Sequence, residues 1–183
     1  KGIVMDAFVA GEGGTLADVF IQVKIGLANR RFPSPSEPVV LDQVKCVYVP
    51  HVVGLMTNQP LIVRNSDDHL HNVHSFPQRN SPFNIGQSTK GLESNLRFAV
   101  PETGIPVQCD LHPWMSAWIH VSDRPFFAVT GLNGRYSIPG LPPGDYEIVA
   151  WHERFPKAPR VAKVKVASGE AATVDFSFEV TRK

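Results

Sequence analysis

The sequence predicts an all-β chain made of two β-sandwiches. It has 16 prolines and 14 glycines in 183 residues, while charged residues make up only 19%. This composition favours many short strands joined by turns over long solvated helices. An apolar share of 43% is sufficient for one large core or two small ones.

The N-terminal part contains two expected strands and a linker. The strands are expected at residues 2–5 and 16–24, on either side of a glycine-rich turn. Residues 32–38 then contain three prolines in seven positions, which disfavours a helix and indicates a linker. We expect a domain boundary there.

Short apolar runs separated by turn residues fill the middle of the chain, and they predict a compact sandwich. These runs lie at residues 45–49, 60–64, 72–76, 96–100 and 118–121. A second block begins near Pro125. Its strands are expected at residues 126–129, 134–138 and 145–151, followed by two later strands, with a tight turn at residues 139–144.

Charge and motifs exclude several classes of function. Lys and Arg number 18 against 17 for Asp and Glu, and no long basic run occurs, so we expect no nucleic-acid partner. No stretch approaches the roughly 20 apolar residues of a membrane span. Hydrolase and nucleotide-binding motifs are missing from the sequence, so no enzyme activity is predicted. The start at Lys1 fits a processed chain, and we expect a periplasmic or otherwise extracytoplasmic location.

One short loop carries three side chains of kinds that bind copper. Cys109, His112 and Met115 occur within seven residues, between two apolar runs. A soft thiolate, two imidazoles and a weak axial thioether form the ligand set of a mononuclear electron-transfer copper site. The loop supplies three of these four groups, so the second imidazole must come from elsewhere.

Three nearby histidines are candidates for that fourth ligand. Strand alternation places His69 and His71 on one face and His74 on the other, and we select His71. Asp67 and Asp68 precede these histidines. We interpret the two carboxylates as a solvated turn rather than as a general acid–base pair.

Residues 45–122 resemble the cupredoxin family of blue copper proteins, in particular its plastocyanin- and amicyanin-like members. The resemblance rests on residues 48–50, residues 59–65, the run His71-Asn72-Val73 and the loop of residues 109–115. It implies a Greek-key β-sandwich over residues 38–124 with one mononuclear type 1 copper ion. The implied ligands are His71, Cys109, His112 and Met115.

The same resemblance implies a protein that moves single electrons. Asn72 would tie the two ligand loops together through hydrogen bonds. Pro113 and Trp114, next to His112, would form an apolar patch for docking. The partner would be a redox protein such as a cytochrome or a membrane redox complex.

Residues 133–148, which read NGRYSIPGLPPGDYEI, resemble the carboxypeptidase-regulatory-like (transthyretin-like) β-sandwich family. In that family two strands precede the matched segment, and residues 1–27 contain two expected strands. We therefore favour a discontinuous second domain of residues 1–30 and 125–183 over three consecutive modules, because insertions into exposed loops are well tolerated. The resemblance implies an accessory, adhesion or docking module.

Cys46 is not explained by this ligand set. By the cupredoxin resemblance it lies on the loop beside the exposed histidine ligand, where it could approach Cys109. We favour a free thiol beside the site over a disulfide with Cys109, and a second thiolate ligand least. His51, His69 and His74 lie near the expected site as structural side chains or alternative metal ligands, whereas His120 and His152 have no companions at ligand spacing.

Two other functions remain open on the sequence. The first is a structural or interaction module whose site holds no copper or is closed by a Cys46–Cys109 disulfide. The second is copper storage or delivery, in which His51, His69 and His74 would bind more than one metal ion per chain.

Overall fold

The computed structural model describes residues 14–28 and 30–179, and it confirms the prediction of an all-β chain. Strands β1 to β13 account for the regular structure, and no described residue lies in an α-helix. The described residues therefore include no helix long and apolar enough to cross a membrane. The strand expected at residues 2–5 lies outside the described part.

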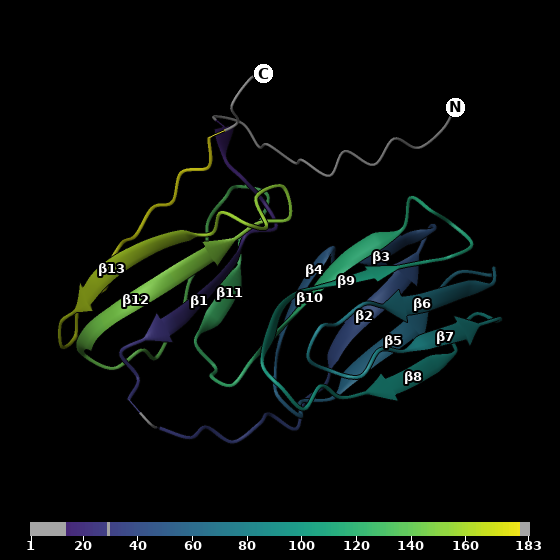
Figure 1. Ribbon diagram of the computed structural model, residues 1–183, viewed down its shortest axis with the longest axis horizontal. Coiled ribbons are helices and arrows are strands. Elements are labelled where there is room, and N and C mark those ends of the chain that lie inside the picture. Colours follow the sequence, from purple (N-terminus) through teal and green to yellow (C-terminus); the bar gives the residue numbers. More distant parts are fainter. Residues whose placement is uncertain (1–13, 29, 180–183) are drawn as a thin grey trace. The chain divides into compact units, whose positions relative to one another are not determined.

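The described residues divide into two compact units (Figure 1). One unit consists of residues 32–125. The other consists of residues 14–28 and 30–31 together with residues 126–179. The second unit is thus discontinuous in the sequence, and the first occupies the interval between its two parts.

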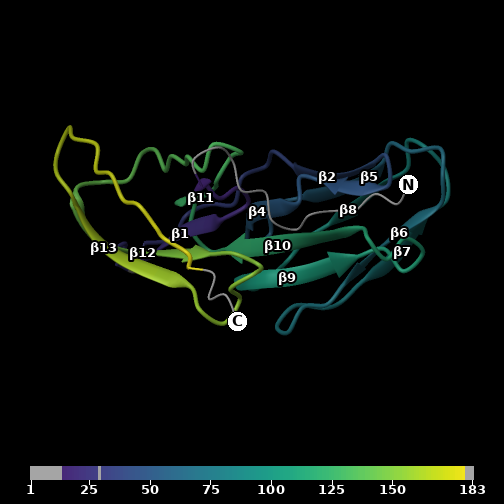
Figure 2. The ribbon, with the colours of Figure 1, turned by 90° about the horizontal axis from the view of Figure 1, so that it is seen from above.

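The unit of residues 32–125 is a sandwich of two sheets, with strand orders β4-β10-β9-β6-β7 and β3-β2-β5-β8. Figure 2 shows β2 and β5 in one layer and β9 and β10 in another. Apolar side chains of both sheets meet in one buried cluster, which includes Leu41 and Leu61 from one sheet and Ile105 and Ile119 from the other. The strands are β2 (Val39–Val44), β3 (Val47–Val49), β4 (Val52–Met56), β5 (Leu61–Asn65), β6 (His71–Ser75), β7 (Asn84–Gln87), β8 (Glu93–Leu96), β9 (Glu102–Gln108) and β10 (Ser116–Ser122).

The other unit contains a four-stranded sheet in the order β11-β1-β12-β13. Strand β1 pairs antiparallel with both β11 and β12, so segments from the two ends of the sequence share one sheet. Phe20, Ile21 and Ala150 are buried here. The strands are β1 (Phe20–Ile25), β11 (Phe127–Val129), β12 (Gly144–Trp151) and β13 (Arg160–Val166).

Two strands expected in this unit do not form. Residues 134–138 and residues 171–179 alternate in burial, yet neither segment joins a ladder. Their alternate side chains, such as Tyr136 and Val174, are half-buried, and the Tyr136 hydroxyl donates a hydrogen bond to the Val174 carbonyl at 2.8 Å. The alternation therefore reflects a half-buried face rather than strand pairing.

The strand expected at residues 96–100 is also displaced, because β8 ends at Leu96. The backbone of Val100 bonds to the side chain of Asn80 instead of to a neighbouring strand: its N–H donates to Asn80 Oδ1 at 3.0 Å and its carbonyl accepts from Asn80 Nδ2 at 2.9 Å. A side chain that satisfies both backbone groups removes the need for a ladder at this position.

Candidate metal centre

The loop between β9 and β10 is a short closed turn. Cys109 follows β9 directly, and Met115 precedes β10. The loop is closed by two backbone hydrogen bonds, from Cys109 N to the Met115 carbonyl at 3.1 Å and from Met115 N to the His112 carbonyl at 2.8 Å. These bonds hold Cys109, His112 and Met115 on one compact turn.

His71 comes to this loop from the first position of β6. Because β6 pairs antiparallel with β9, with His74 opposite Gln108, the chain that continues past β9 runs beside the start of β6. His71 Nδ1 lies 3.0 Å from His112 Nδ1, and His112 Nδ1 lies 3.5 Å from Cys109 Sγ. The structure thus brings together three of the four expected ligands, with donor atoms within 4.8 Å of one another.

The three side chains lie at one end of the sandwich core. His71 is 0% exposed and Cys109 1%, while His112 is half-buried. Met115, the fourth expected ligand, is also 0% exposed and belongs to the same buried apolar cluster as Cys109. The donor set is therefore largely shielded from water and opens outward only at His112.

Asn72 links the two ligand segments. Its Oδ1 accepts hydrogen bonds from the Asp110 N–H at 2.8 Å and from Cys109 Sγ at 3.3 Å. Its own carbonyl accepts from the Tyr48 hydroxyl at 2.6 Å. A single amide side chain therefore connects the start of β6 with the loop after β9.

Asp67 differs from its neighbour Asp68 in that it contacts one of the expected ligands. Asp68 is exposed, but the Asp67 side chain is only 13% exposed, and its Oδ2 lies 3.0 Å from His71 Nε2. Burial raises the pKa of Asp67, but hydrogen bonds from the N–H groups of Cys46 and Lys45 and from His71 outweigh it and hold the pKa below its usual value. The interpretation as a solvated turn is wrong for Asp67, because these donors take the place of water.

Cys46 is a free thiol, as is Cys109. Burial, the nearby Asp67 carboxylate and Cys109 all raise the pKa of Cys46. Its sulfur lies in a second group of possible metal donors, formed with Asp67 and His71, whose atoms are also within 4.8 Å of one another. Both cysteines thus lie in the neighbourhood of His71.

The remaining histidines of this region have other contacts. His51 Nδ1 lies 3.1 Å from the Ser116 carbonyl. His69 is exposed. His74 Nδ1 lies 3.1 Å from both carboxylate oxygens of Asp110. These three side chains are not brought into the donor group of Cys109 and His112.

Pro113 and Trp114 lie at the surface beside His112. Both are exposed, Trp114 to 45%. The Trp114 ring lies 5.3 Å from the His112 ring between centroids, and its Nε1 donates to the Cys46 carbonyl at 3.0 Å. Trp114 is thus an anchored side chain on the exposed side of His112.

The donor set fits copper. Burial lowers the pKa of His112, and the neighbouring imidazoles of His71 and His69 lower it further, so a neutral ring with a lone pair is favoured. Two imidazoles beside one cysteine sulfur, with a thioether in the same core, combine the soft and borderline donors that copper prefers.

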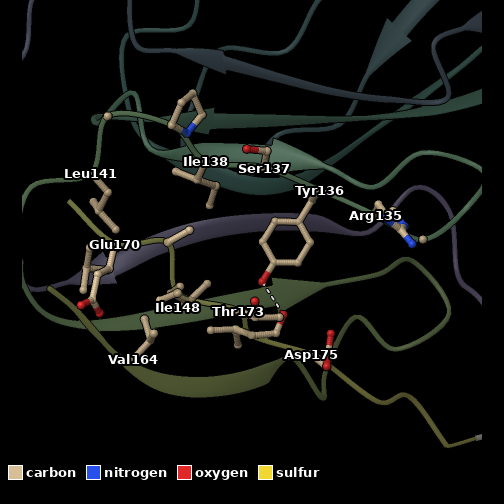
Figure 3. A pocket seen from close by; sticks show the side chains of 17 residues that line it. Arg135, Tyr136, Ser137, Ile138, Leu141, Ile148, Val164, Glu170, Thr173 and Asp175 are labelled. Atoms are coloured by element: carbon tan, nitrogen blue, oxygen red, sulfur yellow. Dashed lines mark hydrogen bonds between the residues drawn. The ribbon is translucent and has the colours of Figure 1, made fainter. Parts of the chain in front are cut away.

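A pocket in the other unit lacks histidine and cysteine side chains that could bind copper. Figure 3 shows its lining, which is formed mainly by residues 134–141 and 170–175 with Ile148 and Val164 from the sheet. The cavity measures about 670 Å³ and contains no histidine or cysteine among its lining residues. Among the described residues, both groups of side chains that could hold a metal ion lie in the sandwich of residues 32–125.

No family model and no curated protein matches the sequence. Similar solved structures include a Cu-containing nitrite reductase from Thermus scotoductus, at 20% identity and TM-score 0.44 over 55% of this chain and 25% of that one. A purple cupredoxin from Nitrosopumilus maritimus matches 46% of this chain and 99% of its own at 18% identity and TM-score 0.40. Amicyanin from Paracoccus versutus matches 56% of this chain and 97% of its own, at 20% identity and TM-score 0.42.

The present chain spans a quarter of the nitrite reductase chain but nearly all of the two smaller proteins. At these identities and scores the likeness assigns no ligand, activity or partner to this protein.

Proposed function

We propose that the protein binds one copper ion in a mononuclear type 1 site and transfers single electrons rather than acting as an enzyme. The observation that carries this proposal is the convergence of His71 Nδ1, His112 Nδ1 and Cys109 Sγ within 4.8 Å. Met115, in the same buried cluster as Cys109, is the proposed axial ligand. This combination of donors is typical of copper electron-transfer sites.

The residues around the site would have separate roles in electron transfer. Bound copper supplies a one-electron couple. Cys109, His71 and His112 would hold the ion, while Asn72 fixes the position of the sulfur through its hydrogen bond. The apolar cluster around Cys109 and Met115 excludes water, and the half-buried ring of His112 would carry the electron between the donor group and the surface.

The surface around His112 is the proposed docking site for a redox partner. Pro113 and Trp114 expose apolar side chains there, and aromatic side chains are enriched in protein interfaces. The partner would be a redox protein such as a cytochrome or a membrane redox complex, outside the cytoplasm. The discontinuous unit would act as a transthyretin-like accessory module that attaches the copper domain to a larger assembly.

Copper loading tests the proposal. Protein with both cysteines reduced is mixed with cupric ion, and an intense visible thiolate-to-copper band is expected. The variant Cys109→Ser is expected to abolish the band, whereas Cys46→Ser retains it. Loss of the band in Cys46→Ser, or its absence in the unaltered protein, would count against a site built on Cys109.

Copper storage or delivery is a second candidate, favoured by the second donor group of Cys46, Asp67 and His71. The number of ions bound per chain separates the two functions. One tightly bound ion, lost in Cys109→Ser, supports electron transfer. Two or more ions, one of them lost in Cys46→Ser, support storage.

A further inference from the structure

Both ring nitrogens of His71 have a partner. The side chain is 0% exposed. Its Nδ1 faces His112 Nδ1 at 3.0 Å, on the side of the proposed metal, and its Nε2 faces Asp67 Oδ2 at 3.0 Å on the other side. With no access to water, these two contacts decide where the ring carries its proton.

The carboxylate fixes the tautomer of His71. A carboxylate whose oxygens already accept backbone N–H groups, Oδ1 from Lys45 and Oδ2 from Cys46, acts towards His71 as an acceptor as well. Nε2 of His71 is therefore the donor in this contact, and in the neutral form of the ring the lone pair of Nδ1 is then directed at His112 and Cys109. This is the tautomer that a metal ion on that side requires.

Asp67 is itself held from several directions. Its Oδ1 accepts from the Lys45 N–H at 2.6 Å and its Oδ2 from the Cys46 N–H at 2.7 Å. Its own N–H donates to the wholly buried Asn65 side chain at 2.9 Å. The carboxylate thus occupies a prepared position, with His71 as one of its donors.

We propose that Asp67 is a positioning residue for the metal centre, which orients His71 and favours the cupric over the cuprous ion. This inference rests on the proposed function. A carboxylate bonded to a ligating imidazole raises the basicity of that ligand and fixes its orientation. Its negative charge also stabilises the more highly charged oxidation state, so Asp67 lowers the reduction potential.

The test compares Asp67→Asn with Asp68→Asn, which removes the same charge from an exposed neighbour. Nitrogen-15 NMR of copper-free protein is expected to show the His71 proton on Nε2 in the unaltered protein and in Asp68→Asn. In Asp67→Asn the proton distributes over both nitrogens, copper affinity falls about 10–100-fold, and the reduction potential rises. Asp67→Glu, which keeps the charge, restores the potential in part.

A proton on Nδ1 of His71 in the unaltered protein would overturn the proposal, and this measurement needs no variant to fold. An Asp67→Asn protein that equals Asp68→Asn in tautomer, affinity and potential would overturn it as well. If copper gives no visible band in any of these proteins, the proposed function fails. The tautomer measurement on copper-free protein still decides whether Asp67 orients His71.

Discussion

At the residue scale, the candidate site depends on side chains that each satisfy several partners. Asn72 accepts from the Asp110 N–H and from Cys109 Sγ, and Asp67 accepts from two backbone N–H groups and His71. Neither residue is an expected ligand. Both nevertheless determine where ligand atoms lie, because buried polar groups stay in the position that satisfies their hydrogen bonds.

Truncation of Asn72 is expected to destabilise the copper-free protein. Asn72→Ala removes the acceptor of the Asp110 N–H and of Cys109 Sγ, and the net contribution of a hydrogen bond of this kind is about 0.5–1.5 kcal/mol. Urea unfolding monitored by tryptophan fluorescence measures the loss. Asn84→Ala is the matched control, since the exposed Asn84 also bonds to Asp110 but accepts nothing from the ligand loop. Equal losses in the two variants would contradict the role assigned to Asn72.

At the element scale, the turn between β2 and β3 connects both ligand segments. Lys45 and Cys46 form a two-residue loop, with Val44 paired to Val47, and both have positive φ, 55° and 57°. The N–H groups of the turn donate hydrogen bonds to Asp67, which contacts His71. The Cys46 carbonyl accepts a hydrogen bond from Trp114, whose ring packs on His112. The backbone of Cys46 rather than its thiol accounts for these contacts.

Cys46→Gly is therefore expected to stabilise the copper-free protein relative to Cys46→Ala. Both variants lack the thiol, so they differ mainly in the cost of positive φ, which glycine tolerates at a turn of this type. The expected gain in the free energy of unfolding is up to about 1 kcal/mol. Glycine removes the cost of positive φ, but its greater freedom in the unfolded chain offsets part of that gain. Urea midpoints of the two variants measure the difference, and a lower midpoint for Cys46→Gly would show that the turn carries no such strain.

The sequence was informative where local pattern and local chemistry coincide. The runs at residues 60–64 and 72–76 correspond closely to β5 and β6, because short apolar runs bounded by turn residues mark strands. The run expected before the ligand loop corresponds to β9 (Glu102–Gln108), although Pro106 within it argues against a central strand. Its place between β10 and β6 is set by long-range pairing that no local pattern reveals.

The same contrast applies to the candidate site. The spacing of Cys109, His112 and Met115 on one loop could be predicted from the sequence because the loop is continuous. The bond between Asp67 and His71 could not, because an aspartate at a strand end reads as a solvated turn. The one available signal was its position four residues before His71, which becomes meaningful only once the turn of Lys45 and Cys46 is known to bind it.

At the scale of the whole molecule, stability is linked to pH through groups away from the ligands as well as near them. Hydrogen bonds, first from His74 and then from Asn84 and Asn72, lower the pKa of Asp110 to about 2 against burial. Such a group contributes stability above its unfolded pKa of 3.8, and this contribution is lost as the pH falls toward 2. Acid therefore weakens the sandwich through its carboxylates.

His120 extends the acid sensitivity to higher pH. It is 0% exposed, its Nδ1 accepts from the Gly104 N–H at 3.1 Å, and burial lowers its pKa from 6.5 to about 3. Between these values the unfolded chain binds a proton that the folded chain does not. The free energy of unfolding is thus expected to fall as the pH decreases from 6.5, by about 1.4 kcal/mol per pH unit midway between the two pKa values.

The variant His120→Asn isolates this effect, because an amide oxygen can accept from Gly104 but does not titrate. Urea unfolding of copper-free protein between pH 4.5 and pH 7 should show a shallower slope for His120→Asn than for the unaltered protein, even though the variant is less stable at pH 7. Parallel slopes would place the proton uptake on other histidines, with the half-buried His112 as the next group to test, since its pKa is also lowered by burial.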